Sequence, residues 1–178
     1  MKYVALLRGI NVGGNARVEM ARLKATFEDL GFKDVKTYIN SGNVIFSTTR
    51  KSPARMTTDI EAAIEQDFGF RVPVVLRDED AMVATAKALP RTWVNDQSVR
   101  TDVIFLWREV DSPKVLEQLI IKPGIDKVRY VPGAILWHMD RKNVTRSGLN
   151  GTVSSDIYKK VTIRNATTVR KLVALLNP

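Results

Sequence analysis

The fold is decided by residues 38–46, whose sequence is YINSGNVIF. The apolar run Val44-Ile45-Phe46 is typical of a strand, and Val35 to Tyr38 is a second short strand just before it. Between them stands Asn40-Ser41-Gly42-Asn43, a cluster of the residue types that form tight turns. The segment therefore predicts a β-hairpin, and the segments on either side of it predict the topology of the sheet that contains the hairpin.

On the N-terminal side, Lys2 to Arg8 is a short apolar run that predicts a strand. A loop rich in glycine and asparagine follows from Gly9 to Asn15. Four apolar residues then recur at helical spacing, and Gly31 is placed to end the helix. They are Met20, Leu23, Phe27 and Leu30.

On the C-terminal side, Ser52-Pro53 predicts a helix start, because serine caps free backbone amides and proline fits the first helical position. Gly69 is placed to end this helix, and residues 72–76 predict a fourth strand. Pro73 favours an edge position for that strand, since proline cannot donate to the ladder. The order strand, helix, strand, strand, helix, strand predicts a ferredoxin-like βαββαβ subdomain.

The second half follows a similar order. Acidic residues 78–80 predict the start of a third helix, and residues 102–107 predict a central strand because they are apolar on both faces. Ser112-Pro113 predicts another helix, residues 128–139 a hairpin, and Asn165 the cap of a last helix. We therefore expect an α+β protein with a ferredoxin-like subdomain over 1–90, a linker over 90–98, and a second α+β subdomain of similar element order over 99–178.

The composition excludes several chemistries. The chain has no cysteine, which excludes disulfides, thiolate metal sites and a cysteine nucleophile. The only histidine is His138, so a multi-histidine metal site is excluded as well. The N-terminus lacks a signal-peptide pattern and no apolar run is long enough to span a bilayer. We expect a soluble cytoplasmic protein, away from membranes, that carries no metal and no cofactor.

The positive charge is concentrated near the end of the chain. The formal net charge is +9, and residues 141–178 hold eight Lys and Arg against the single Asp156, a net charge of +7. Such a segment can attract phosphates, nucleic acid or an acidic partner. The alternative is a solvated face that only keeps the protein soluble, and the charge alone does not separate the two.

A candidate ligand site follows from the predicted topology. The first two strands of a βαββαβ unit run in the same direction, so the loop after the first strand and the turn after the second emerge at the same edge. Glycines there let backbone amides approach an anion, while arginine and asparagine add specific donors. Residues of the basic segment near the last helix could close the site. The candidate ligand-binding residues are Arg8, Asn11, Gly13, Gly14, Asn15, Arg17, Asn40, Ser41, Asn43, Arg164 and Asn165.

Each of these motifs also has a purely structural interpretation. Glycine and asparagine occur in turns everywhere, so the loop and the hairpin turn could serve only to reverse the chain. No phosphate-binding glycine motif of the P-loop or dinucleotide type is present. His138 lies in an apolar strand with no nucleophile motif elsewhere in the chain, which favours a structural histidine. No catalytic residue is predicted, and whether the protein is an enzyme stays open.

The chain resembles a bacterial family known as domain of unknown function 1697. The resemblance rests on residues 3–14, YVALLRGINVGG, on residues 38–46, YINSGNVIF, and on residues 162–169, TIRNATTV. In that family a tryptophan usually follows the closing Arg-Asn pair, and Ala166 stands in its place here. The resemblance implies an α+β fold of ferredoxin-like character, with no established activity or cofactor and no catalytic residues to assign.

Three functions therefore stay open. The first is binding, with or without turnover, of a small anionic or nucleotide-like ligand at the glycine- and asparagine-rich edge. The second is a nucleic-acid-binding module that uses the basic segment 141–171. The third is a protein-interaction module without a small ligand.

Overall fold

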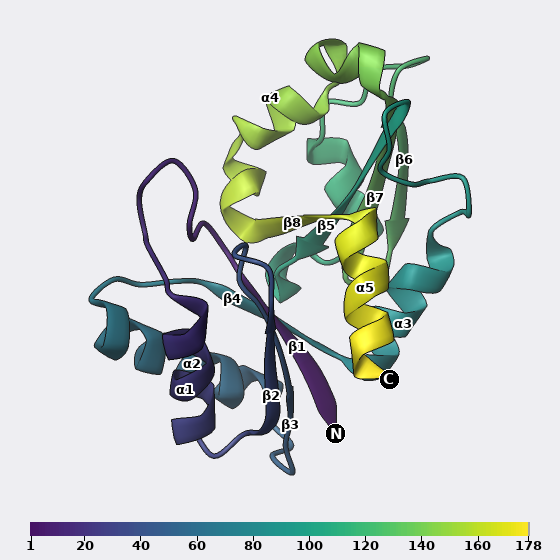
Figure 1. Cartoon of the computed structure of the whole chain (residues 1–178). Helices are drawn as coiled ribbons and strands as arrows, with labels where there is room; N and C mark the ends of the chain where they lie inside the picture. The colour runs from purple at the N-terminus through teal and green to yellow at the C-terminus, as the bar shows by residue number, and fades with distance from the viewer. Residues whose placement is uncertain (178) are drawn as a thin grey trace. The chain divides into compact units, whose positions relative to one another are not determined.

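The computed structural model describes residues 1–177 of the chain (Figure 1). Its contacts divide it into two compact units. The N-terminal unit comprises residues 1–80 together with the residues from Ala174 on, and the C-terminal unit comprises Ala81–Val173. No helix within residues 1–177 is both long enough and apolar enough to cross a membrane.

The N-terminal unit has the predicted βαββαβ order and an antiparallel four-stranded sheet. Its strands lie in the order β2-β3-β1-β4, so that β1 and β3 are central. Strand β4 is an edge strand, as Pro73 predicted, although it begins at Val74, two residues later than expected. The elements are β1 (Lys2–Leu7), α1 (Met20–Asp29), β2 (Lys33–Tyr38), β3 (Asn43–Ser47), α2 (Pro53–Phe68) and β4 (Val74–Asp78).

Helix α2 begins and ends where the sequence predicted. The Ser52 hydroxyl accepts a hydrogen bond from the Arg55 amide at 3.3 Å, which satisfies one of the free N–H groups of the first turn. Gly69 adopts the left-handed conformation, with a φ of 80°, and its N–H donates to the Glu65 carbonyl at 2.8 Å. Helix α1 differs, because Glu19 precedes it and provides no side-chain cap.

The core of the N-terminal unit lies between the sheet and the two helices. Leu23 and Phe27 of α1 and Ile60 of α2 are fully buried against the inward-facing residues of the central strands. Those strand residues alternate, which is the period-2 pattern of a strand with one face on the core. Four aromatic rings stack or tilt against one another at its centre: Tyr3, Phe27, Phe32 and Phe46.

The C-terminal unit repeats the strand order of the first. Its antiparallel sheet has the order β6-β7-β5-β8, so the first strand of the unit is again central and the last again lies at an edge. The prediction of two α+β subdomains with similar element order is therefore confirmed. The strands are β5 (Val99–Leu106), β6 (Lys127–Val131), β7 (Ala134–Asp140) and β8 (Val161–Asn165). Helices α3 (Glu79–Ala88) and α5 (Ala166–Leu176) have most of their residues in this unit.

The connections of the C-terminal unit are shorter and less regular than predicted. Ser112-Pro113 opens a 3₁₀ helix, η2 (Pro113–Gln118), and Ser112 forms no side-chain cap. A six-residue run with two or three apolar positions cannot separate an α-helix from a 3₁₀ turn, which explains the difference. The remaining short elements are η1 (Arg108–Val110), η3 (Arg141–Arg146), α4 (Leu149–Val153) and η4 (Asp156–Lys160).

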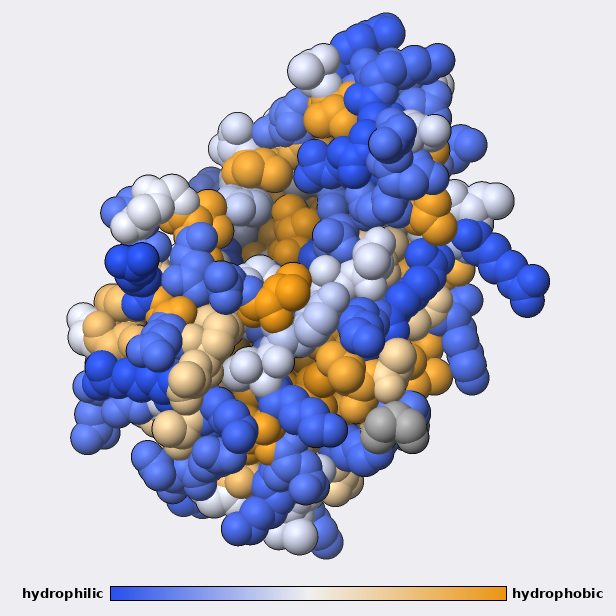
Figure 2. Space-filling model, viewed as in Figure 1, coloured by the Kyte–Doolittle hydropathy of each residue, from blue (hydrophilic) through white to orange (hydrophobic). Residues whose placement is uncertain are grey.

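Hydrophilic side chains dominate the face of the molecule drawn in Figure 2, with apolar residues gathered in smaller areas among them. Six large apolar residues are exposed in the described part of the chain. Two of them, Val12 and Ile39, lie in the loop after β1 and in the turn after β2. The loop end of the N-terminal sheet therefore combines polar side chains with exposed apolar ones.

The hairpin turn has a glycine that no other residue can replace without strain. Gly42 has a φ of 80°, and a Cβ atom there would lie 2.7 Å from both the Leu7 Cβ and the Ile10 Cδ1. We expect Gly42→Ala to lower the free energy of unfolding by about 2–4 kcal/mol, from the left-handed conformation and from overpacking together. Denaturant unfolding followed by circular dichroism measures this loss.

Gly31→Ala is the matched control for this substitution. Gly31 has a similar φ of 83°, but no atom lies within 4 Å of an added Cβ. It should therefore lose only the conformational contribution of about 1–2 kcal/mol. Equal losses for the two variants would show that the hairpin turn does not pack against Leu7 and Ile10 in the way described.

Candidate functional site

The topology of the N-terminal sheet brings two loops together. Strands β1 and β2 both pair antiparallel with β3, so they run in the same direction and end at the same edge of the sheet. The loop after β1 and the turn after β2 meet there directly, because the Asn11 Nδ2 donates to the Asn40 carbonyl at 2.8 Å. The structure thus brings together the two segments that the sequence placed at one edge.

Asn11 fastens this loop with three side-chain hydrogen bonds. Besides the bond to Asn40, its Nδ2 donates to the Val18 carbonyl at 3.0 Å and its Oδ1 accepts from the Val18 amide at 2.8 Å. The backbone of Asn11 is left-handed, with a φ of 53°, which asparagine tolerates better than most residues. The Asn11 side chain therefore sets the path of the loop, and little of its donor capacity is left for a ligand.

Backbone strain is concentrated around the same loop and turn. Among residues 1–177 the non-glycine residues with positive φ are Asn11, Ala16, Ile39 and Asp34, and the first three lie in these two segments. A β-branched residue such as Ile39 rarely adopts this conformation. Strained backbone persists only where the surrounding contacts hold it, and it is frequent at ligand sites.

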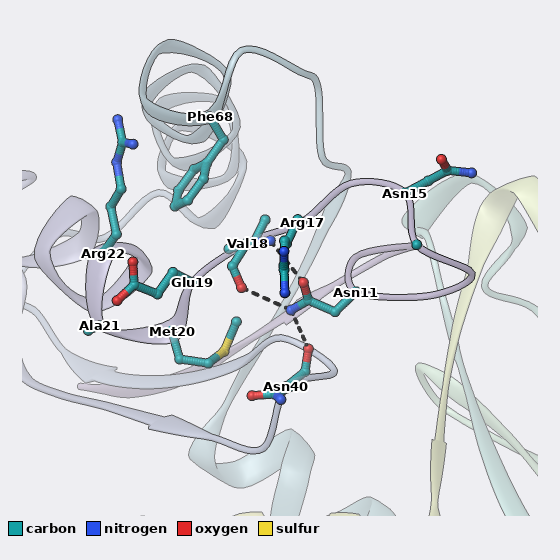
Figure 3. A pocket seen from close by; sticks show the side chains of 11 residues that line it. Asn11, Asn15, Arg17, Val18, Glu19, Met20, Ala21, Arg22, Asn40 and Phe68 are labelled. Atoms are coloured by element: carbon teal, nitrogen blue, oxygen red, sulfur yellow. Dashed lines mark hydrogen bonds between the residues drawn. The ribbon is translucent and has the colours of Figure 1, made fainter.

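Beside the loop lies an open hollow of about 1060 Å³, which we call the α1 hollow (Figure 3). Its walls come from the loop after β1, the first turn of α1, the turn after β2 and the end of α2. It is wholly part of the N-terminal unit. The residues that line it are Asn11, Gly14, Asn15, Arg17, Val18, Glu19, Met20, Ala21, Arg22, Asn40 and Phe68.

The charges of the α1 hollow favour an anion. Arg17 and Arg22 are exposed, and within residues 1–177 neither forms a salt bridge. Glu19 is the only acid in the lining, so the hollow has a net charge of +1. The first turn of α1 also faces it, and the partial positive charge of a helix N-terminus adds to the arginines.

The apolar part of the hollow comes from α1 and α2. Val18 and Met20 line it on the α1 side, and the ring of Phe68 lines it from the last residue of α2. The Arg22 guanidinium lies over the Phe68 ring, 5.1 Å from its centroid, in a cation–π arrangement. The hollow therefore combines positive charge, amide side chains and one aromatic face.

Six residues singled out from the sequence do not line the hollow, and four of them belong to the N-terminal unit. Arg8 is half-buried at the end of β1, where its amide donates to the Pro73 carbonyl at 2.9 Å. Gly13 is exposed in the loop. Asn43 is fully buried, and its Nδ2 donates to the Tyr38 carbonyl at 2.9 Å and to the Ser41 Oγ at 3.1 Å. The side chains of Ser41 and Asn43 thus hold the hairpin turn.

Arg164 and Asn165 belong to the C-terminal unit. Arg164 in β8 is only 7% exposed, and this burial lowers the pKa of its guanidinium to about 10, so it stays charged at neutral pH. Its Nη1 donates to the Thr162 Oγ1 at 3.0 Å and to the Ile163 carbonyl at 2.8 Å. Asn165 caps α5, because its Oδ1 accepts from the Thr168 amide at 2.8 Å. The predicted helix cap is confirmed, and a ligand role for either residue stays a prediction.

His138 is part of the packing of the C-terminal unit. It is 7% exposed, its Nδ1 lies 2.8 Å from the Thr101 Oγ1, and its ring stacks on Trp93 with centroids 4.9 Å apart. Burial, together with nearby Lys127, lowers the pKa of His138 below its ordinary value. Within residues 1–177 no group of acids, cysteines or histidines is arranged to hold a metal ion.

Six residues that line the hollow were not predicted from the sequence: Val18, Glu19, Met20, Ala21, Arg22 and Phe68. Helix α1 starts at the edge of the sheet where β1 ends. Strand β3 starts at the same edge and runs away from it, so the helix that follows, α2, runs back toward that edge. The first turn of α1 and the last residue of α2 must therefore lie near the loop after β1. That signal was present in the predicted topology, which also gave the expected ends of both helices.

Substituting Asn11 tests whether it holds the hollow together. We expect Asn11→Ala to lower the free energy of unfolding by about 1–3 kcal/mol, because it removes three hydrogen bonds, to the Val18 and Asn40 carbonyls and from the Val18 amide. Asn15 lies in the same loop, but it is exposed and its side chain forms no hydrogen bond within residues 1–177. Asn15→Ala should therefore change the free energy of unfolding by less than about 0.5 kcal/mol. Chemical denaturation gives both values, and amide exchange at Val18 should accelerate only in Asn11→Ala. Equal behaviour of the two variants would contradict this role.

Comparison with known proteins places the chain in a family. A conserved bacterial protein, SP0830 from Streptococcus pneumoniae, has a solved structure that matches with a TM-score of 0.83 and 29% sequence identity, covering 99% of this chain and 98% of that one. A search of curated proteins finds no match. The model of the family described as protein of unknown function (DUF1697) matches residues 1–137. The chain is therefore a member of the DUF1697 family.

Proposed function

We propose that the α1 hollow binds a small anionic ligand. The observation that carries this proposal is that Arg17 and Arg22, which form no salt bridge within residues 1–177, line the same hollow as several amide side chains. Arginine donors bind phosphate and carboxylate groups in the strong, charge-assisted way. Asn15 and Asn40 are exposed beside them and add neutral donors.

The first turn of α1 supports the same ligand class. No side chain caps this turn, and Ala21 and Arg22 from it line the hollow. An oxyanion at this place would receive backbone N–H donors as well as the helix dipole. Glu19 opposes the anion with one negative charge, which limits the affinity but leaves the balance of charge positive.

The lining favours binding over covalent chemistry. Among its residues, Glu19 is the only group that could act as a general base, and none is a histidine, cysteine, serine or threonine. Nucleophilic catalysis needs an activated nucleophile with a base beside it. We therefore propose a binding site. If the bound ligand reacts there, the reactive group must belong to the ligand.

The other two functions have less support. In the basic segment 141–171, Arg164 is buried, and the Arg170 guanidinium donates to the Trp93 carbonyl at 3.0 Å and to the Pro90 carbonyl at 3.1 Å. Those side chains are engaged within the protein, which reduces what the segment offers to a nucleic-acid backbone. A protein-interaction surface would need an extended apolar area, and the exposed Ile120, Ile121 and Val153 of the C-terminal unit are the residues that could contribute to one.

Titration with inorganic pyrophosphate tests the proposal. We expect isothermal titration calorimetry to detect binding that Arg17→Ala weakens about tenfold, because it removes a charge-assisted contact. Arg22→Ala should weaken binding less, because Arg22 lies beside Phe68 and acts on the anion from a greater distance. Glu19→Gln should strengthen binding severalfold, since it removes the opposing charge. Raising the salt concentration should weaken binding, because the site is open to solvent.

Arg91→Ala is the control for charge. Arg91 is exposed in the C-terminal unit and is not part of the hollow, so its loss changes the net charge by the same amount as the loss of Arg17. Binding that is absent, or that falls equally in Arg91→Ala and Arg17→Ala, would rule out a specific anion site in the α1 hollow.

A further inference from the structure

The size of the α1 hollow argues against a bare inorganic anion as its ligand. Sites for small organic molecules and cofactors have volumes of roughly 300–1,000 Å³, and the volume of the hollow, about 1060 Å³, slightly exceeds the upper end of that range. A single phosphate would contact only one part of the wall. The wall also includes Val18, Met20 and the Phe68 ring, which give an inorganic ion no favourable contact.

The wall has two chemically different ends, as Figure 3 shows. Arg17, Asn11 and Asn40 lie together at one end, with Val18 between them and α1. The ring of Phe68 lies at the other, near Arg22. A ligand that fills both ends must therefore carry a negative group and a flat apolar group.

Phe68 is held in place for stacking. It is the last residue of α2, and it packs against the core of the N-terminal unit, with the Phe70 ring 6.4 Å away. The side chain is half-buried, so part of the ring is open to the hollow. The guanidinium of Arg22, 5.1 Å from the ring centroid, is itself planar and can stack on a ring.

We propose that the ligand of the α1 hollow is a nucleoside phosphate, with its phosphate at Arg17 and its base stacked on Phe68 beside Arg22. This inference rests on the proposed function, because it names the ligand class of the same anion site. Every base has a π face that an aromatic side chain can stack on, and arginine adds a cation–π contribution. The ligand source is either a free nucleotide or the phosphorylated end of a nucleic-acid strand.

Four probes separate the two groups of the ligand in the wild-type protein. They are AMP, ribose 5-phosphate, adenosine and a trinucleotide with a 5′-phosphate, each titrated by calorimetry at one salt concentration. We expect AMP to bind at least about fivefold more tightly than ribose 5-phosphate, because only AMP carries the stacking base. Adenosine should bind more weakly than AMP. A trinucleotide that binds more tightly than AMP identifies a strand end as the source, and one that binds more weakly identifies a free nucleotide.

Three variants test the role of the ring. Phe68→Leu should abolish the preference for AMP over ribose 5-phosphate, whereas Phe68→Tyr, which retains a ring, should keep it. Phe70→Leu is the matched control, because Phe70 packs against the same core but does not line the hollow. It should lose stability without losing the preference.

The outcomes distinguish this inference from the proposed function. If pyrophosphate binds in an Arg17-dependent manner but AMP binds no better than ribose 5-phosphate, the proposal of an anion site is supported and the proposal of a stacked base is wrong. If neither pyrophosphate nor any of the four probes binds, both are wrong. The comparison of probes on the wild-type protein decides the matter even if Phe68→Leu does not fold.

Discussion

The side chain of Asn11 is the contact on which the loop end of the N-terminal unit depends. It bonds to Val18, just before α1, and to Asn40, in the turn between β2 and β3. One side-chain amide thereby joins the loop after β1, the residue before the start of α1 and the turn after β2. The contact is possible because β1 and β2 run in the same direction, which the pairing of both with β3 enforces.

The same constraint explains why the hollow is open and polar. The side chain of Asn11 holds the loop, so the other residues of the loop can stay exposed. Gly13, Gly14 and Asn15 are all exposed. Ala16, whose φ is 50°, is held to the same loop, because its carbonyl accepts a hydrogen bond from the Asn11 amide at 3.1 Å.

Local signals in the sequence predicted much of the fold. Ser52, Gly69 and Asn165 act within a few residues of their own position, so capping rules located them without knowledge of the tertiary structure. Pro73 marked an edge strand for an equally local reason. The prediction for the segment after Ser112 was wrong, because a 3₁₀ helix and an α-helix share the same short apolar pattern.

The candidate site was predicted only in part, because side-chain direction and burial are tertiary properties. Topology brought the loop after β1 and the turn after β2 together, but it could not tell that Asn11 and Asn43 would be used to hold their own segments. It also could not tell that Arg164 would be 7% exposed. Phe68 was missed although it ends a predicted helix, because nothing local distinguishes a phenylalanine that lines a hollow from one that fills a core.

The central claim is that one anion site lies where the loop after β1, the start of α1 and the end of α2 meet. Mapping of backbone amide chemical shifts during titration with AMP tests it most directly, since every residue reports separately. The account predicts shifts concentrated in residues 11–22, at Asn40 and at Phe68, with saturation at a common affinity. Shifts confined to residues 141–171, or spread evenly over the surface, would contradict it.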